Sequence, residues 1–93
     1  MTENNILAIG SIAQDLKRVA SFIGRDSVAG AYRFLQEAKN RISDINTAKL
    51  PVYVITYIKA VERLDEKDEP RELAEQALTI GCILQNAAVA AKH

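Results

Sequence analysis

Most of the features that mark a specialised class of protein are missing from this sequence. It has one cysteine, Cys82, among 93 residues, and this excludes a disulfide-stapled scaffold. No apolar run reaches the roughly 18 residues that suggest a membrane span. The segment Met1–Asn5 carries no positively charged side chain, so we expect no signal peptide.

An excess of charge of either sign is also missing. Twelve Lys and Arg against twelve Asp and Glu give a formal net charge of zero, which removes the usual electrostatic reason for binding nucleic acid. Hydrophobic residues make up 48% and charged residues 26% of the chain, a composition that excludes intrinsic disorder. The sequence therefore predicts one globular domain over residues 1–93 in the cytoplasm, with no membrane or nucleic-acid partner.

The first half of the chain shows helical periodicity. Apolar side chains recur at alternating steps of three and four in residues 5–23 and again in residues 27–45, which places each set on one helix face. Asn4 or Asn5 is expected to cap the first helix, and Gly24 to end it in a left-handed conformation. The short link between the two segments favours an antiparallel helix pair.

The second half predicts two further helices. Pro51 and Pro70 stand where a helix favours proline, at its first residue. Residues 52–58 are rich in β-branched and aromatic side chains, which would also suit a strand. No second candidate strand exists to pair with this segment, so we predict a helix. Four helices with short links predict an all-α fold, an antiparallel up-down-up-down four-helix bundle.

Acidic residues crowd the hairpin between the third and fourth predicted helices. Two carboxylate pairs, each on one helix face, could hold Mg²⁺ across such a hairpin. The candidate ligands are Glu62, Asp65, Glu72 and Glu75. Their E-x-x-D and E-x-x-E spacing resembles that of all-α nucleoside triphosphate pyrophosphohydrolases, and the resemblance implies an alternative function as a Mg²⁺-dependent enzyme. The pairs depart from that family because they lie at the turn, with Arg63, Lys67 and Arg71 between them. The other interpretation is a solvated hairpin tip.

The sequence indicates no other catalytic arrangement. Cys82 has no neighbouring histidine, and the one histidine is His93, so neither a nucleophile with a base nor a zinc-ligand set is indicated. We interpret Cys82 as a small buried hydrophobic side chain that reacts slowly with thiol reagents. The sequence therefore favours a non-enzymatic protein without a cofactor.

The third and fourth predicted helices carry more apolar side chains than one buried stripe requires. A helix that is apolar nearly all round must be covered on more than one side. Gly81 stands inside a helix, where glycine costs about 1 kcal/mol relative to alanine, so it indicates the close approach of another helix. We therefore predict a protein-interaction or regulatory module that forms a homodimer and binds a further protein partner. The predicted interface residues are Val52, Ile55, Ile58, Leu78, Gly81 and Ile83.

Overall fold

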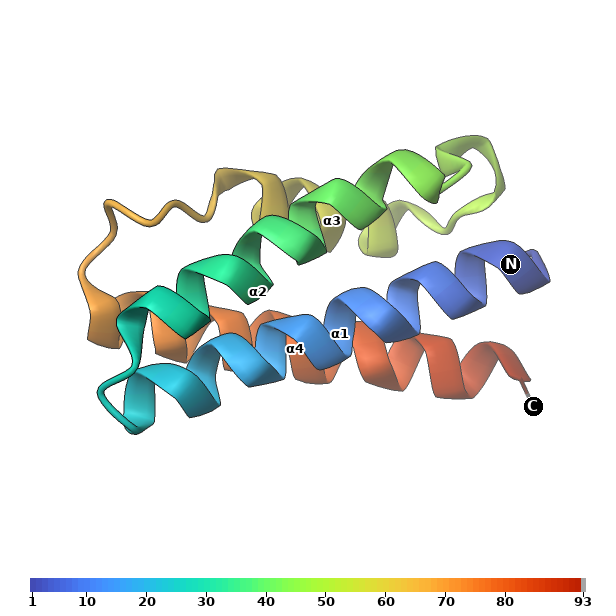
Figure 1. The fold of residues 1–93 in the computed structure, drawn as a ribbon. Coiled ribbons are helices and arrows are strands. Elements are labelled where there is room, and N and C mark those ends of the chain that lie inside the picture. Colours follow the sequence, from blue (N-terminus) through green and yellow to red (C-terminus); the bar gives the residue numbers. More distant parts are fainter. Residues whose placement is uncertain (93) are drawn as a thin grey trace.

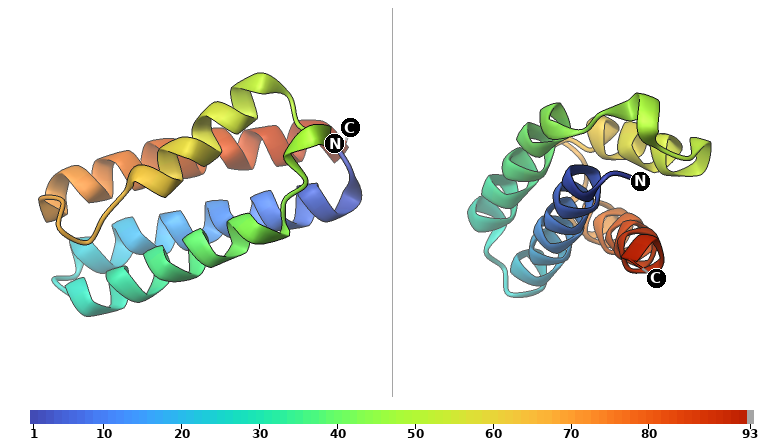
Figure 2. Two further views of the ribbon diagram at one scale, coloured as in Figure 1. Left: turned by 90° about the horizontal axis from the view of Figure 1, so that it is seen from above. Right: turned by 90° about the vertical axis from the view of Figure 1, so that its right-hand side faces the viewer.

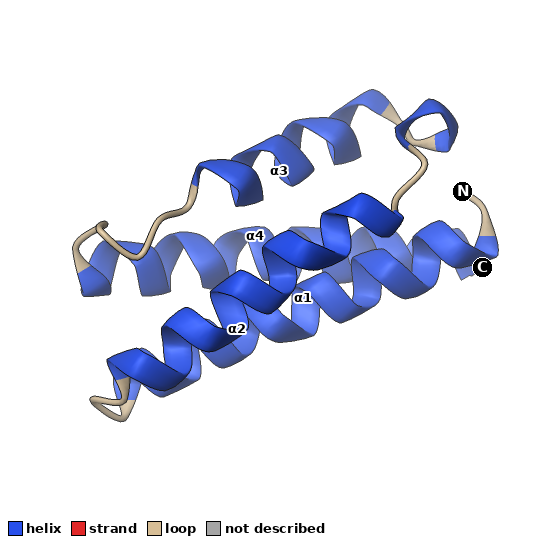
Figure 3. Ribbon diagram, turned by 45° about the horizontal axis from the view of Figure 1, so that its top comes forward, coloured by secondary structure: helices blue, strands red, loops and turns tan. Residues whose placement is uncertain are grey.

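The computed structural model of the chain describes residues 1–92, and His93 lies outside the described part. Residues 1–92 form four α-helices and two short 3₁₀ helices, with no strand among them (Figure 3). The elements are α1 (Glu3–Gly24), α2 (Val28–Arg41), η1 (Ile42–Asp44), η2 (Thr47–Lys49), α3 (Val52–Arg63) and α4 (Pro70–Lys92). The all-α prediction is confirmed, including the helical assignment of residues 52–58.

Helix α1 lies in the middle of the molecule, between α2 and α4 (Figure 2). Helix α3 completes the arrangement and contacts α4 more extensively than α2. The start of α1 and the end of α4 lie at one end of the molecule, and the α1–α2 and α3–α4 connections lie at the other (Figure 1). These helix contacts are compatible with the predicted bundle. The radius of gyration is 12.5 Å, close to the about 12.3 Å of a compact domain of this length.

The four helices share one hydrophobic core. The stripe predicted for α1 is fully buried from Ile9 to Val19, as its three–four spacing requires. Helix α2 contributes smaller side chains, with Ala31 and Ala38 on either side of Leu35. The buried stripe of α4 is Leu73, Ala77, Ile80, Gly81, Leu84, Ala87 and Ala88. Within residues 1–92, no helix combines the length and the apolar content needed to span a membrane.

The two ends of α1 differ from the prediction. Thr2, rather than Asn4 or Asn5, caps the helix by accepting a hydrogen bond from the Asn5 backbone N–H at 3.1 Å. After the helix, the left-handed residue is Asp26, with φ of 59°, and not Gly24. Asp tolerates this conformation better than most residues. The turn therefore reverses the chain two residues later than the glycine suggested.

Asn5 instead holds the link between α2 and α3. Its side chain is buried, with 1% of its surface accessible. Its Nδ2 donates to the Asn46 carbonyl oxygen at 3.0 Å, and its Oδ1 accepts from the Asn46 N–H at 2.9 Å. This reciprocal pair satisfies a buried amide and a loop backbone together. It fixes the irregular segment 42–50 against the start of α1.

Candidate protein-interaction surface

The six predicted interface residues lie in three environments. Val52 and Leu78 are exposed, with 80% and 48% of their surface accessible. Ile55 and Ile83 are half-buried and lie outside the core cluster. Ile58 and Gly81 are buried in the core of the chain itself. A partner can therefore cover at most four of the six residues.

The burial of Ile58 corrects the predicted register of α3. Ile58 lies four residues after Val54 and three before Val61, so it completes the stripe that faces the core. Tyr57 lies three residues after Val54 and four before Val61, so spacing alone favours it equally for this stripe, but it is half-buried at the edge of the core. An aromatic ring with a hydroxyl group is well suited to such an edge, because its polar end can stay in water.

The burial of Gly81 explains why a glycine stands inside α4. A Cβ atom built on Gly81 would lie 3.2 Å from the Ala13 carbonyl oxygen and 3.3 Å from Leu16 Cβ. Both distances are shorter than ordinary van der Waals contact. The close helix approach predicted at Gly81 is therefore present, but it occurs between α4 and α1 of the same chain.

The outer side of α4 carries a stripe of exposed residues at alternating steps of three and four. This spacing keeps the side chains on one helix face. We call these residues the α4 stripe: Glu75, Leu78, Cys82, Gln85, Val89 and Lys92. Leu78 and Val89 each expose 48% of their surface. The stripe therefore presents two large apolar side chains, with an acid at one end and a base at the other.

Cys82 was predicted to be buried, and this prediction is wrong: the thiol is exposed. Cys82 directly follows Gly81, so it points about 100° further round the helix. That rotation carries the side chain from the α1–α4 contact to the outer face. The apolar character of Cys82 thus belongs to the α4 stripe and not to the core.

Two hollows lie along the seam between α1 and α4, one on each side of the contact at Gly81. The first, of about 270 Å³, is lined by residues of α1 and of the C-terminal half of α4, among them Leu7, Gly10 and Val89. The second, of about 500 Å³, includes Ile23 and Pro70 in its lining. Leu7 exposes 60% of its surface and shares the first hollow with Val89. Polar side chains also line this hollow, namely Ser11, Gln14, Gln85 and Lys92, so its lining is mixed.

Hydrogen bonds within the turn organise the acidic hairpin. Asp68 accepts a hydrogen bond from the Asp65 backbone N–H at 3.0 Å. Glu69 accepts from the backbone N–H groups of Arg71 and Glu72, at 3.1 and 3.0 Å. Unpaired N–H groups at a helix start favour such an acceptor. Glu69 therefore caps the start of α4, and Asp68 stabilises the tight turn before it.

The candidate Mg²⁺ ligands are not brought together. All four are exposed (Glu62, Asp65, Glu72 and Glu75). Glu75 lies 3.7 Å from the Arg71 guanidinium on its own helix. Within residues 1–92, no three His, Cys, Asp or Glu side chains gather where they could hold a metal ion. The geometry thus lacks the ligand set that the resemblance to pyrophosphohydrolases implied.

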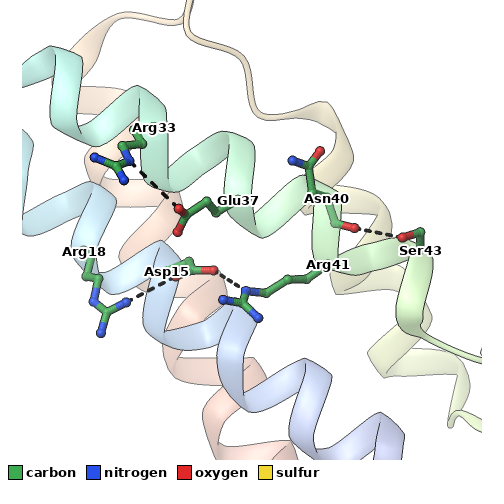
Figure 4. A network of polar contacts seen from close by, with 7 residues as sticks. All are labelled: Asp15, Arg18, Arg33, Glu37, Asn40, Arg41 and Ser43. Carbon is green, nitrogen blue, oxygen red and sulfur yellow. Dashed lines mark hydrogen bonds and ion pairs between the residues drawn. The ribbon is translucent and has the colours of Figure 1, made fainter.

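Sequence analysis overlooked a buried carboxylate on α1. Asp15 exposes 1% of its side chain and accepts a hydrogen bond from Arg41 Nε at 2.8 Å, with Arg18 Nη1 at 3.5 Å (Figure 4). The i,i+4 spacing of Glu37 and Arg41 predicts a pair on α2, but Glu37 lies 4.0 Å from Arg33 instead. Asp15 lies three residues after Ile12, but this spacing does not by itself indicate a buried carboxylate, because the burial depends on Arg41. Its role is structural, because Arg41 ties α1 to the end of α2, whereas Arg18 lies on α1 itself.

Large apolar side chains are exposed on α1 and α4 (Leu7, Leu78 and Val89) and at the start of α3 (Val52 and Tyr53). Single exposed hydrophobic residues are normal, whereas a contiguous group indicates a contact site. Leu7 and Val89 line one hollow, and Leu78 continues the same face along the α4 stripe. Such a surface is able to bind another apolar helix face.

In comparisons with known proteins, no family model, no curated protein and no solved structure matches this chain.

Proposed function

We propose that this chain is a non-catalytic helical interaction module of the cytoplasm that forms a homodimer. In this proposal it is a single-domain, antiparallel up-down-up-down four-helix bundle. The observation that supports the proposal is the α4 stripe, in which Leu78 and Val89 stay about half exposed on a helix whose opposite face packs in the core. An interface is the simplest way to cover such a stripe.

The exposed apolar area sets the strength of the expected dimer. Full burial of a Leu or Val side chain contributes about 1.5–3 kcal/mol. Leu7, Leu78 and Val89 already bury about half of their surface, so six such side chains in a dimer would add about 4–9 kcal/mol. Association costs at least about 4 kcal/mol in lost freedom. The largest of these gains less the smallest cost leaves about 5 kcal/mol, so we expect a reversible dimer with a dissociation constant of about 0.2 mM or weaker.

The remaining predicted residues provide a second surface. Ile83 lies five residues after Leu78, about 140° round the helix, so the two cannot share one flat interface. Ile83 on α4 and Ile55 on α3 are both half-buried and lie outside the core cluster. Val52, at the start of α3, is exposed. We assign these three residues to the further protein partner and not to the homodimer.

Light scattering at about 1 mM chain, above the expected dissociation constant, tests the proposal. The expected mass is twice the chain mass of 10.2 kDa. Leu78→Glu places a charge in the interface and is expected to give a monomer. Gln76→Glu adds the same charge at an exposed position outside the α4 stripe, and it is expected to stay dimeric. A mass of one chain for the unmodified protein, or equal behaviour of the two variants, would reject the homodimer.

A further inference from the structure

The α4 stripe matches itself when a second copy of the helix runs in the opposite direction. Its six positions are arranged symmetrically about a midpoint between residues 83 and 84. A two-fold axis through this midpoint brings Glu75 opposite Lys92 of the second copy. The same axis brings Leu78 opposite Val89, and Cys82 opposite Gln85. Each residue thus meets a partner of compatible character.

We propose, on the basis of the proposed homodimer, that α4 packs antiparallel against α4 of the second copy about this midpoint. Charge decides the direction. Glu75 already has Arg71 of its own helix 3.7 Å away, and the antiparallel pairing adds Lys92 of the second copy at both ends of the interface, whereas a parallel pairing would place like charges opposite each other. The contact runs for about 26 Å along the helix axis, from residue 75 to residue 92 at 1.5 Å per residue. An interface of this kind is isologous and closes as a dimer.

Gly10 gives independent support for a second helix at this place. It lies inside α1, where glycine costs about 1 kcal/mol relative to alanine. Unlike Gly81, it has no compensating contact, because a Cβ built on it would meet no atom within 4 Å in the chain. Gly10 lines the same hollow as Leu7 and Val89. In the antiparallel dimer, Leu78 of the second copy faces Val89 and enters this hollow as a knob. The absence of a side chain on Gly10 leaves room for Leu78 of the second copy.

Cross-linking between engineered cysteines tests the pairing. The exposed Cys82 is first replaced by serine, and Glu75→Cys and Lys92→Cys are introduced separately into this background. One variant carries a tag so that mixed and self-linked dimers differ in mass. A short bis-maleimide is the probe. We expect a cross-linked mixed dimer and little cross-linking of either variant alone, because residue 75 lies about 26 Å along the axis from residue 75 of the second copy.

The outcomes separate this inference from the proposed function. Self-linking of either variant alone, or no cross-link in the mixture, overturns the antiparallel pairing. If the unmodified chain still has twice the chain mass in light scattering, the homodimer stands on another surface. If it has the mass of one chain, the proposed homodimer fails as well. Circular dichroism of each variant confirms that the helices are retained.

Discussion

The ion pair between Asp15 and Arg41 makes the sharpest stability prediction. Asp15 on α1 exposes 1% of its side chain, and Arg41 Nε at the end of α2 lies 2.8 Å from its Oδ2. Arg41→Met removes the charge and the hydrogen bond to Asp15 but keeps an apolar stem. The buried carboxylate then loses its better partner, and its desolvation is no longer compensated.

The structure sets the size of the effect. Removing one partner of a fully buried ion pair costs about 3–5 kcal/mol, and a hydrogen bond to a charged group contributes about 1.5–3 kcal/mol. Arg41 exposes 43% of its side chain, and Arg18 at 3.5 Å remains, so the lower part of this range applies. We expect Arg41→Met to lower the free energy of unfolding by about 2–3 kcal/mol. In a domain of this size that is a fall in Tm of roughly 10–20 °C.

Thermal and urea unfolding followed by circular dichroism measure this loss. The matched control is Arg33→Met on the same helix, because Arg33 and Glu37 are 4.0 Å apart and Arg33 exposes 79% of its side chain. An exposed pair of this kind contributes under about 1 kcal/mol. A double-mutant cycle with Asp15→Asn isolates the coupling between the two residues. Equal losses in Arg41→Met and Arg33→Met would refute the reasoning.

Three further predictions use the same structure. In the Leu78→Glu background, which removes association, Gly10→Ala is expected to raise the free energy of unfolding by up to about 1 kcal/mol. Gly81→Val is expected to lower it by about 1–3 kcal/mol through overpacking against α1; unfolding in urea measures both. Cys82 is expected to react several-fold faster with a thiol reagent in Leu78→Glu than in the unmodified dimer, and equal rates would show that no partner covers it. Asn5→Ala, which leaves the link after α2 unpaired, is expected to cost about 1–3 kcal/mol and to increase amide exchange at residues 45–48, measured by NMR.

Periodicity predicted the helices of this chain well and their polar contacts poorly. The steps of three and four identified the buried face of α1 because its stripe is long and unbroken. In α3 the segment 52–58 is apolar on most sides, so its pattern left Tyr57 and Ile58 as competitors for the core. Asp15 and Asn5 could not be placed from spacing, because their burial depends on Arg41 and Asn46, which are distant in the sequence.

For the candidate surface too, the sequence predicted the apolar residues but not their contacts. The excess of apolar residues on α4 was visible in the sequence, and Leu78 is exposed in the single chain. Gly81 indicated a close helix approach, but a glycine does not specify whether the approaching helix belongs to the same chain. The order of Glu75, Leu78, Val89 and Lys92 becomes a self-complementary pattern only when the structure shows that all four are exposed on one face.

Folding and association are expected to be separable in this protein. The accessible surface of the chain is 5598 Å², close to the roughly 5,300 Å² of an ordinary folded monomer of its mass. The core cluster includes no residue of the α4 stripe. The chain therefore buries a normal share of its surface without a partner, unlike an obligate dimer whose subunits lack a stable monomeric fold. It follows that Leu78→Glu should abolish the dimer while it leaves the monomer folded, with a Tm that no longer depends on protein concentration. A variant that unfolds instead would show that the stripe belongs to the folding unit.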